Sequence, residues 1–255
     1  MPEPADLPIA LVSGAGRGIG RAIATRLSEE GHRVVLTARS EAELKDSATA
    51  CPNPTLVIPG DATDPSFVDS CYAQIEAQWG PVRVLVANAG AGVSASVVRT
   101  TDEQWQHMLD LNLTAPFRFI RRALPSMLEA KHGRIVVIAS VAAKIGEPYI
   151  AAYTASKHGV LGLVRSTAAE TARSGVTVNA VCPGYVDTPM TDNTVLGIVE
   201  KTGRTPEQAR AALDAKQPTN RLVTPDEVAD AVLLCVRNGS VTGQGVNVDG
   251  GAVQS

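Results

Sequence analysis

Tyr153 and Lys157 stand four residues apart in the sequence, a spacing that can support acid–base chemistry. Residues 150–158 contain no proline or glycine, so a helix is expected there, and it would carry both side chains on one face, one turn apart. An ammonium group about 5 Å from a phenol, at an effective dielectric constant of about 20, stabilises the phenolate by about 3 kcal/mol, or roughly two pKa units. The pair could therefore donate and accept a proton near neutral pH. The same spacing also occurs with a surface tyrosine and a solvated lysine, so its meaning depends on the rest of the chain.

A glycine-rich turn near the N-terminus is typical of a phosphate-binding loop. An apolar run precedes residues 13–20, which read Ser-Gly-Ala-Gly-Arg-Gly-Ile-Gly, and a stretch of helical period follows them. Glycine lets the backbone approach a phosphate closely, and a helix N-terminus favours an anion. The spacing of Gly14, Gly18 and Gly20 fits Ser/Thr-Gly-x-x-x-Gly-x-Gly rather than Gly-x-Gly-x-x-Gly, because Ile19 takes the sixth place. A plain turn is the alternative, but the flanking strand and helix favour a dinucleotide site.

The end of the second predicted strand indicates which dinucleotide is preferred. In a strand–helix–strand unit of this kind, that position faces the adenosine ribose, and a carboxylate there suits the 2′-hydroxyl of NAD. Here the strand ends in Ala38-Arg39, and the next acid is Glu41. A guanidinium pairs with a 2′-phosphate, and Arg17 in the glycine-rich turn could reach the same group. The alternative for each arginine is a solvated loop charge. The sequence predicts NADP(H), with NAD(H) less favoured.

Two polar residues that follow later strands each have two interpretations. Asp61 could accept a hydrogen bond from the adenine amino group, or it could serve as a turn or capping acid before the helix expected at residues 66–79. Asn88 lies in a run of small residues, Ala-Asn-Ala-Gly-Ala-Gly, which suggests close approach of the backbone to a ligand. Asn88 could contact the cofactor, or it could tie the central strands together.

A long helical stretch is expected over residues 103–131, after a capping Thr101-Asp102. Apolar residues recur in it at four-residue steps and are expected in the core: Trp105, Leu109, Leu113 and Phe117. Asn112 lies within this apolar pattern, and a buried amide must be hydrogen-bonded. Asn112 is therefore either structural or part of a polar network.

Seven apolar segments alternate with helical ones and predict a Rossmann-like, doubly wound α/β fold, with one parallel seven-stranded sheet and helices on both faces. The predicted strands lie at residues 9–12, 33–37, 56–58, 82–86, 133–139, 176–181 and 243–248. No break in composition and no repeat divides the chain, so we expect a single NAD(P)-binding domain over residues 1–255. Residues 190–217 are polar and partly helical, and we expect them to form a substrate lid over the site.

Composition excludes several other classes of protein. Apolar residues make up 44% and charged residues 19% of the 255 residues, and the net charge is −3, which favours neither nucleic-acid nor membrane binding. The N-terminal residues are polar and acidic, unlike a signal peptide. The cysteines are scattered, with no metal-ligand spacing, so no metal site is predicted: Cys51, Cys71, Cys182 and Cys235. Reduced thiols indicate a cytoplasmic protein.

Several motifs taken together resemble the short-chain dehydrogenase/reductase family in its single-domain form. The resemblance covers essentially the whole chain and rests on Ser13-Gly14-x-x-x-Gly18-Ile19-Gly20, Asp61, Asn88-Ala89-Gly90, Asn112, Ser140, Tyr153-x-x-x-Lys157 and Pro183-Gly184. Two departures are small. Ser13 stands where threonine is common and keeps the hydroxyl, and Ala87 replaces the first residue of the family's Asn-Asn-Ala-Gly.

The resemblance implies a role for each of four catalytic residues. Tyr153 would be the general acid/base, and Lys157 would hold the nicotinamide ribose and lower the pKa of the phenol. Ser140 would hydrogen-bond the substrate oxygen, and Asn112 would hold a water that links Lys157 to solvent as a proton relay.

The resemblance also implies the cofactor contacts and the assembly. The contacts are expected from Gly14, Arg17, Gly18, Ile19, Gly20, Arg39, Asp61, Ala62, Asn88, Ala89, Gly90, Tyr153, Lys157, Pro183, Gly184, Val186 and Thr188. Family members are commonly homotetramers, and the helices at residues 103–131 and 153–173 would form the larger interface.

The implied activity is the interconversion of a ketone and a secondary alcohol by hydride transfer, with NADP(H) preferred. Residues 182–190 and 156–159 resemble bacterial β-ketoacyl and polyketide ketoreductases, which suggests a 3-ketoacyl or polyketide-like carbonyl. The alternatives are an NAD-dependent dehydrogenase of a secondary alcohol, such as a 3-hydroxyacyl compound or 3-hydroxybutyrate, and, more distantly, a non-catalytic NADP-binding sensor. The substrate pocket is expected from residues 91–97, 141–149 and 190–217 and from Tyr185. Many of these residues are small or apolar, which suits an acyl chain, a ring or a steroid equally well.

Overall fold

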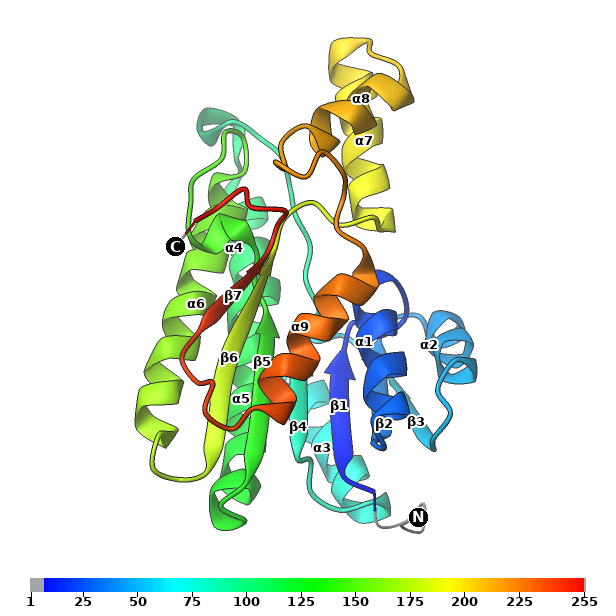
Figure 1. The fold of residues 1–255 in the computed structure, drawn as a ribbon, viewed down its shortest axis with the longest axis vertical. Coiled ribbons are helices and arrows are strands. Elements are labelled where there is room, and N and C mark those ends of the chain that lie inside the picture. The colour runs from blue at the N-terminus through cyan, green and yellow to red at the C-terminus, as the bar shows by residue number, and fades with distance from the viewer. Residues whose placement is uncertain (1–6, 255) are drawn as a thin grey trace.

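The computed structural model describes residues 7–254, and its centre is one parallel seven-stranded sheet in the order β3-β2-β1-β4-β5-β6-β7 (Figure 1). The strands are β1 (Ile9–Ser13), β2 (Arg33–Ala38), β3 (Thr55–Pro59), β4 (Val84–Ala87), β5 (Gly133–Ile138), β6 (Val176–Pro183) and β7 (Gly245–Val248). The order reverses between β1 and β4, because the chain builds outward to β3 and then returns to pair β4 with β1. The predicted doubly wound α/β fold is confirmed.

Helices cover both faces of this sheet. The helices are α1 (Gly18–Glu29), α2 (Glu41–Thr49), α3 (Pro65–Gln78), α4 (Asp102–Leu109), α5 (Ala115–Glu129), α6 (Ala151–Thr171), α7 (Pro189–Thr202), α8 (Pro206–Asp214) and α9 (Pro225–Arg237). On one face α3, α5 and α6 supply buried side chains, and on the other face α1, α2 and α9 do so. Helix α2 was not predicted from the sequence. Its N-cap residue is Ser40, whose hydroxyl accepts a hydrogen bond from the backbone N–H of Glu43.

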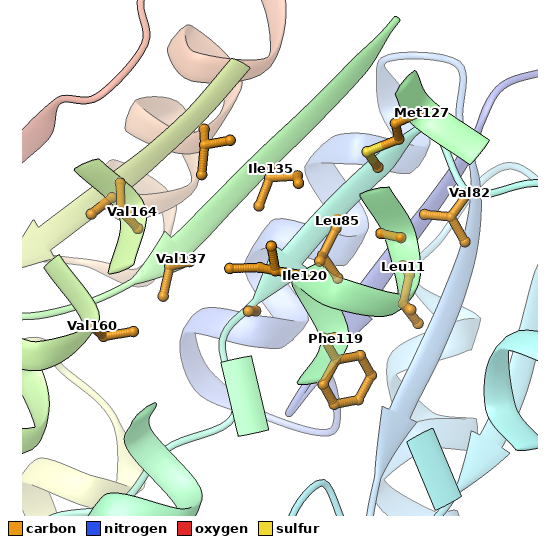
Figure 2. Close-up of a cluster of buried hydrophobic side chains, with 14 of the residues drawn as sticks. Leu11, Val82, Leu85, Phe119, Ile120, Met127, Ile135, Val137, Val160 and Val164 are labelled. Atoms are coloured by element: carbon orange, nitrogen blue, oxygen red, sulfur yellow. The ribbon is translucent and has the colours of Figure 1, made fainter. Parts of the chain in front are cut away.

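Alternation along the strands divides the core into two layers. In the β1–β4 pairing Leu11 stands opposite Leu85, and Val12 stands opposite Val86. The leucines belong to the layer that Figure 2 shows, where Phe119 and other side chains of α5 and α6 pack on the sheet. The valines belong to the opposite layer. Fully burying one such side chain stabilises the fold by roughly 1.5–3 kcal/mol, so both faces hold the sheet in place.

The long helix expected over residues 103–131 is interrupted, and part of its predicted core was wrong. A π-helical turn, η3 (Asp110–Thr114), joins α4 to α5. Trp105 is 42% exposed and Phe117 is 41% exposed, and Leu109 and Leu113 are only half-buried. Four-residue steps drift by about 40° each around a helix of 3.6 residues per turn, so one such series cannot keep facing the sheet. The residues of α5 that do face it include Phe119, Ile120 and Met127, and Met108 of α4 is also buried.

The segment between β6 and α9 forms a pair of helices, α7 and α8, beyond the end of the sheet to which β1 points (Figure 1). Thr205 and Gln208 cap α8 reciprocally. Val195, Ala209 and Leu213 form a small core with Leu222, separate from the two sheet layers. The helical pair is therefore held partly by its own apolar contacts. Across residues 7–254, none of the helices is long and apolar enough to cross a membrane.

Candidate functional site

A cleft of about 1560 Å³ runs along the carboxyl ends of the central strands, on both sides of the β1–β4 junction. This is the position at which ligands bind in doubly wound sheets, because the loops diverge where the strand order reverses. The cleft extends from Arg39 at the end of β2 to Tyr153 on α6. Every residue predicted from the sequence to bind cofactor or to act in catalysis lines it, apart from Asn112.

The glycine-rich turn between β1 and α1 is packed too closely for side chains. Gly14 has a φ of 67°, and a Cβ there would lie 2.9 Å from the Cα of Ala89. A Cβ on Gly20 would lie 2.1 Å from the carbonyl oxygen of Gly14. Helix α1 begins at Gly18, and the side chain of its N-cap residue, Arg17, makes no capping hydrogen bond. The first N–H groups of α1 therefore point to the cleft without a side-chain acceptor, which fits the pyrophosphate of a dinucleotide.

Asn88 joins the ends of β4 and β1. Its Nδ2 donates to the carbonyl oxygens of Ser13 (2.9 Å) and Gly14 (3.1 Å). The Ser13 hydroxyl accepts hydrogen bonds from the backbone N–H groups of Asn88 and Ala89, each at 3.1 Å. Both side-chain donors of Asn88 are thus used within the protein, which favours the strand-tying interpretation for the side chain. Its neighbours Ala89 and Gly90 line the cleft with it.

The adenosine end of the cleft brings together residues from β2, β3 and α2. Arg39 is exposed, and its guanidinium forms no hydrogen bond or ion pair with residues 7–254. Asp61 accepts hydrogen bonds from the N–H and the hydroxyl of Thr63, both at 2.8 Å, and these bonds lower the pKa of its carboxyl. This is the turn geometry proposed as the alternative role of Asp61. Ala62 lines the cleft beside it.

The opposite end of the cleft holds the acid–base residues. Ser140 ends the segment after β5 and accepts a hydrogen bond from the N–H of Ala142 (3.1 Å). The Nζ of Lys157 donates to the carbonyl oxygen of Ile138 (2.8 Å) and lies 5.6 Å from the centre of the Tyr153 ring. Lys157 is buried, and Tyr153 is half-buried. One turn of α6 thus carries both side chains to the end of β5, as their spacing predicted.

Burial is the main influence on the pKa values of Tyr153 and Lys157. Burial raises the pKa of Tyr153, and a hydrogen bond with the Ser140 side chain opposes that rise. Burial lowers the pKa of Lys157 from 10.5 to about 8. Loss of hydration is the largest cause of both shifts, and the effect of Lys157 on the phenol stays a prediction. Tyr153 is accordingly a neutral phenol, able to donate a proton.

Asn112 lies in the π-helical turn, fully buried, behind the cleft. Its Nδ2 donates to the carbonyl oxygen of Ala91 (3.0 Å), and its Oδ1 accepts from the N–H of Ala91 (3.2 Å). A Cβ on Gly90 would lie 2.9 Å from the same Oδ1 and 3.6 Å from the Nζ of Lys157. The amide thus fixes the loop after β4 close to Lys157, and its proton-relay role stays a prediction.

The loop after β6 closes the cleft on the side of α7. Pro183 ends β6, and a Cβ on Gly184 would lie 2.3 Å from the Oε1 of Gln217. The hydroxyl of Thr188 donates to the carbonyl oxygen of Val186 (3.3 Å), and its methyl group faces Gly18. Ile19 lines the cleft on the opposite side, in the first turn of α1.

A polar cluster at the edge of the cleft was not found from the sequence. The Nζ of Lys216 donates to the hydroxyl of Tyr185 (3.0 Å) and lies 3.3 Å from the carboxylate of Glu147. The Tyr185 hydroxyl donates a hydrogen bond to the Oε2 of Glu147 at 3.0 Å. These residues are far apart in the chain and share no motif, so only the folded structure brings them together.

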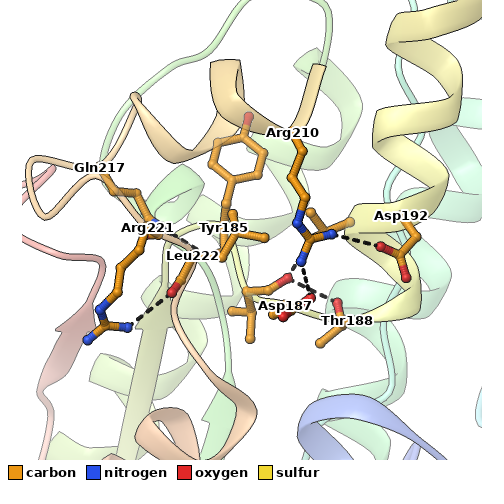
Figure 3. Close-up of polar contacts among 10 residues, drawn as sticks. Tyr185, Asp187, Thr188, Asp192, Arg210, Gln217, Arg221 and Leu222 are labelled. Atoms are coloured by element: carbon orange, nitrogen blue, oxygen red, sulfur yellow. Dashed lines mark hydrogen bonds and ion pairs between the residues drawn. The ribbon is translucent and has the colours of Figure 1, made fainter. Parts of the chain in front are cut away.

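The helical pair is attached to the rim by an arginine. Arg210 of α8 donates to Asp187 in the loop after β6 and to Asp192 of α7, the latter at 3.1 Å (Figure 3). These contacts join three segments that meet beside the catalytic end of the cleft.

Comparison with known proteins agrees with this geometry. Residues 8–197 match the family described as short chain dehydrogenase. A putative ketoacyl reductase of Streptomyces coelicolor is 40% identical over 253 residues, which cover 96% of this chain and 97% of the relative. The 3-oxoacyl-acyl-carrier-protein reductase FabG of Escherichia coli is 36% identical over 247 residues, covering 95% of this chain and 96% of the relative.

A solved structure of an actinorhodin polyketide ketoreductase variant with NADPH has a TM-score of 0.93 and 38% identity, and covers 97% of this chain and 98% of that chain. The resemblance inferred from the sequence motifs is confirmed by the match to the family and by the identity to these relatives along nearly the whole chain. The chain therefore belongs to the short-chain dehydrogenase family of oxidoreductases.

Proposed function

We propose that this chain is an NADP(H)-dependent reductase that converts a ketone of the 3-ketoacyl or polyketide type into a secondary alcohol, and catalyses the reverse reaction. The observation that carries the proposal is one cleft with a neutral phenol at one end and, at the other, a guanidinium that forms no ion pair with residues 7–254. Tyr153 stands beside Ser140 and Lys157, and Arg39 stands where an NAD-binding chain would carry a carboxylate. The names of the relatives, and the NADPH of the similar ketoreductase structure, support the same cofactor and substrate class.

In the proposed reaction, Ser140 and Tyr153 donate hydrogen bonds to the substrate oxygen, where negative charge develops. Tyr153 then delivers its proton to that oxygen, for which a neutral phenol is the required form. The charge of Lys157 stabilises the phenolate that remains. The bound nicotinamide would supply the hydride, and the protein supplies orientation and electrostatics.

The cofactor would be held by the residues predicted from the sequence. The uncapped N-terminus of α1 suits the pyrophosphate, and Arg39 with Arg17 suits the 2′-phosphate. Lys157 would hold the nicotinamide ribose, and Val186 and Thr188 would lie along the nicotinamide. Asn112 would hold a water that links Lys157 to solvent as a proton relay, and its amide also positions the loop at Ala91.

We also propose that residues 1–255 form a single NAD(P)-binding domain in which α7 and α8, within residues 190–217, act as the substrate lid. The separate small core of this pair and its attachment through Arg210 suit a unit that moves as one body.

We further propose a homotetramer in the cytoplasm. The exposed Trp105 and Phe117 lie on α4 and α5, where the larger interface is expected, and would be covered by a second copy. The thiols of Cys51, Cys71, Cys182 and Cys235 are free, which suits a reducing compartment.

Two alternatives make different predictions. An NAD-dependent dehydrogenase of a secondary alcohol would turn over with NADH in preference to NADPH. A non-catalytic NADP sensor would bind the cofactor without turnover, but such proteins have little need of the Ser140, Tyr153 and Lys157 arrangement.

The test is the oxidation of NADPH, and then of NADH, with acetoacetyl-CoA, simple ketones and cyclic diketones. We expect fast oxidation of NADPH with the thioester. Turnover with NADH alone would contradict the cofactor assignment. Turnover of plain ketones without the thioester would keep the hydride chemistry and replace the 3-ketoacyl substrate by a general carbonyl compound. Binding without turnover of any carbonyl would favour the sensor.

A further inference from the structure

A carboxylate that no sequence motif indicates lies at the adenosine end of the cleft. Glu43 lies in the first turn of α2 and lines the cleft together with Arg17 and Arg39. Its Oε1 accepts a hydrogen bond from the Nη1 of Arg17 at 3.1 Å. Arg17 is one of the two arginines expected to hold a 2′-phosphate, so part of its charge is already neutralised.

The position of Glu43 is fixed by the fold. Its backbone N–H donates to the hydroxyl of Ser40, which starts α2 immediately after Arg39. A Cβ on Gly16 would lie 2.9 Å from the Cβ of Glu43 and 3.1 Å from its Oε2, so the carboxylate rests against the glycine-rich turn. Its Oε2 accepts no hydrogen bond from residues 7–254. The backbone of α2 and the contact with Arg17 thus place the carboxylate at the cleft.

A 2′-phosphate and a 2′-hydroxyl respond to such a group in opposite ways. A phosphate carries close to two negative charges at neutral pH and is repelled by a carboxylate that also competes for Arg17. A ribose hydroxyl carries no charge and can donate a hydrogen bond to a carboxylate oxygen. The chain thus combines a guanidinium suited to NADP(H), Arg39, with a carboxylate suited to NAD(H).

We propose that Glu43 is a specificity-determining residue of the cofactor site. It weakens binding of the 2′-phosphate and so reduces the ratio of the affinity for NADP(H) to the affinity for NAD(H). This inference rests on the proposed function, because it takes the cleft to be the cofactor site. Glu43 acts on affinity and not on the hydride transfer, since it lies at the end of the cleft away from Tyr153.

The test compares Glu43→Gln with Glu41→Gln. Both substitutions remove one negative charge from the first turn of α2, but Glu41 pairs with Lys45 at 2.7 Å and does not line the cleft. Dissociation constants for NADPH and NADH are measured by nucleotide fluorescence at low salt. Displacement by 2′,5′-ADP and by 5′-AMP then isolates the adenosine end of the site.

We expect Glu43→Gln to lower the dissociation constants of NADPH and 2′,5′-ADP by about three- to five-fold, which is the scale of an exposed ion pair. The dissociation constants of NADH and 5′-AMP should stay unchanged or rise. The gain should shrink in high salt, because an exposed charge is screened. Glu41→Gln should change none of these constants.

Unchanged or weaker binding of NADPH in Glu43→Gln would overturn the inference, and so would an equal gain for NADPH and NADH or an equal gain in Glu41→Gln. These outcomes leave the proposed function intact. Failure of the parent protein to bind either nucleotide would instead overturn the proposed function.

Discussion

Tyr153 combines a phenol that burial keeps protonated with a neighbour, Ser140, that can share its task at the substrate oxygen. The phenol is therefore ready to donate in the direction of ketone reduction. In the direction of alcohol oxidation it must first lose its proton, which the ammonium of Lys157 favours.

Replacing Tyr153 by phenylalanine removes the proton donor and keeps the ring. We expect kcat for ketone reduction to fall by about 1000-fold, within the range of general acid–base catalysis, while the dissociation constant of NADPH changes little. The control is Tyr149→Phe, because Tyr149 also lines the cleft four residues earlier but is exposed. Full activity of Tyr153→Phe, or an equal loss in Tyr149→Phe, would contradict the assignment.

Burial of the charged Lys157 side chain lowers the free energy of unfolding, and the pH dependence of stability measures this effect. Its pKa is about 8 in the folded chain and 10.5 for an ordinary lysine, so between these values the unfolded chain holds more protons and the free energy of unfolding rises with pH. Below pH 8 both states are protonated, and the full penalty, about 3 kcal/mol, is present.

We therefore expect Lys157→Met to raise the free energy of unfolding of the cofactor-free protein at pH 7 by about 2 kcal/mol, once the loss of the hydrogen bond to Ile138 is subtracted. The gain should disappear as the pH rises toward 10.5. Urea unfolding over this pH range measures it, with the exposed Lys201→Met as the control. A gain that does not change with pH would show that burial does not shift the pKa of Lys157.

The proximity of two residues in one short motif could be predicted from their spacing. The proximity of residues from distant segments that share no motif could not. Tyr153 and Lys157 share one helical turn, and the spacing alone puts them side by side. Glu147, Tyr185 and Lys216 meet only because the loops after β5, β6 and α8 converge. Asp61 and Asn88 had two interpretations each, and the geometry favours the structural one for both side chains.

At the scale of elements, the strands were predicted closely because parallel strands buried on both faces are continuous apolar runs. The helices were predicted less accurately than the strands. Helix α2 has little apolar surface, since only Leu44 and Ser47 are buried. The sequence therefore shows no apolar periodicity that would predict this helix. The π-helical turn shifts the buried face between α4 and α5, which a fixed four-residue step cannot represent.

Arg210 fixes the helical pair α7 and α8 at the rim, so its removal should loosen that pair. We expect Arg210→Met to increase hydrogen exchange over residues 189–214 and to raise KM for the ketone, with a change of at most about 1 kcal/mol in global stability, because the ion pairs are partly exposed. Arg204→Met is the control, since Arg204 is exposed in the same segment and forms no ion pair with the described residues. Unchanged exchange in Arg210→Met would mean that the apolar cluster alone holds the pair.

In the proposed homotetramer, the exposed Trp105 on α4 and Phe117 on α5 would lie in the interface between copies. A charge placed there should prevent association. We expect Trp105→Glu to lower the solution mass from that of a tetramer to that of a dimer or monomer, measured by light scattering. Leu196→Glu on α7, where the leucine is also exposed, should leave the mass unchanged. A parent protein that is monomeric would contradict the proposed assembly.

The strand order has a consequence for synthesis on the ribosome. Strands β1, β2 and β3 emerge first and can pair with one another, but the free edge of β1 is covered only by β4, through Ala10↔Val84, Leu11↔Leu85 and Val12↔Val86. Until residues 84–87 leave the exit tunnel, a nascent chain therefore presents an apolar edge that can pair with another nascent chain. The junction that opens the cleft in the folded protein is therefore, during translation, an unpaired strand edge.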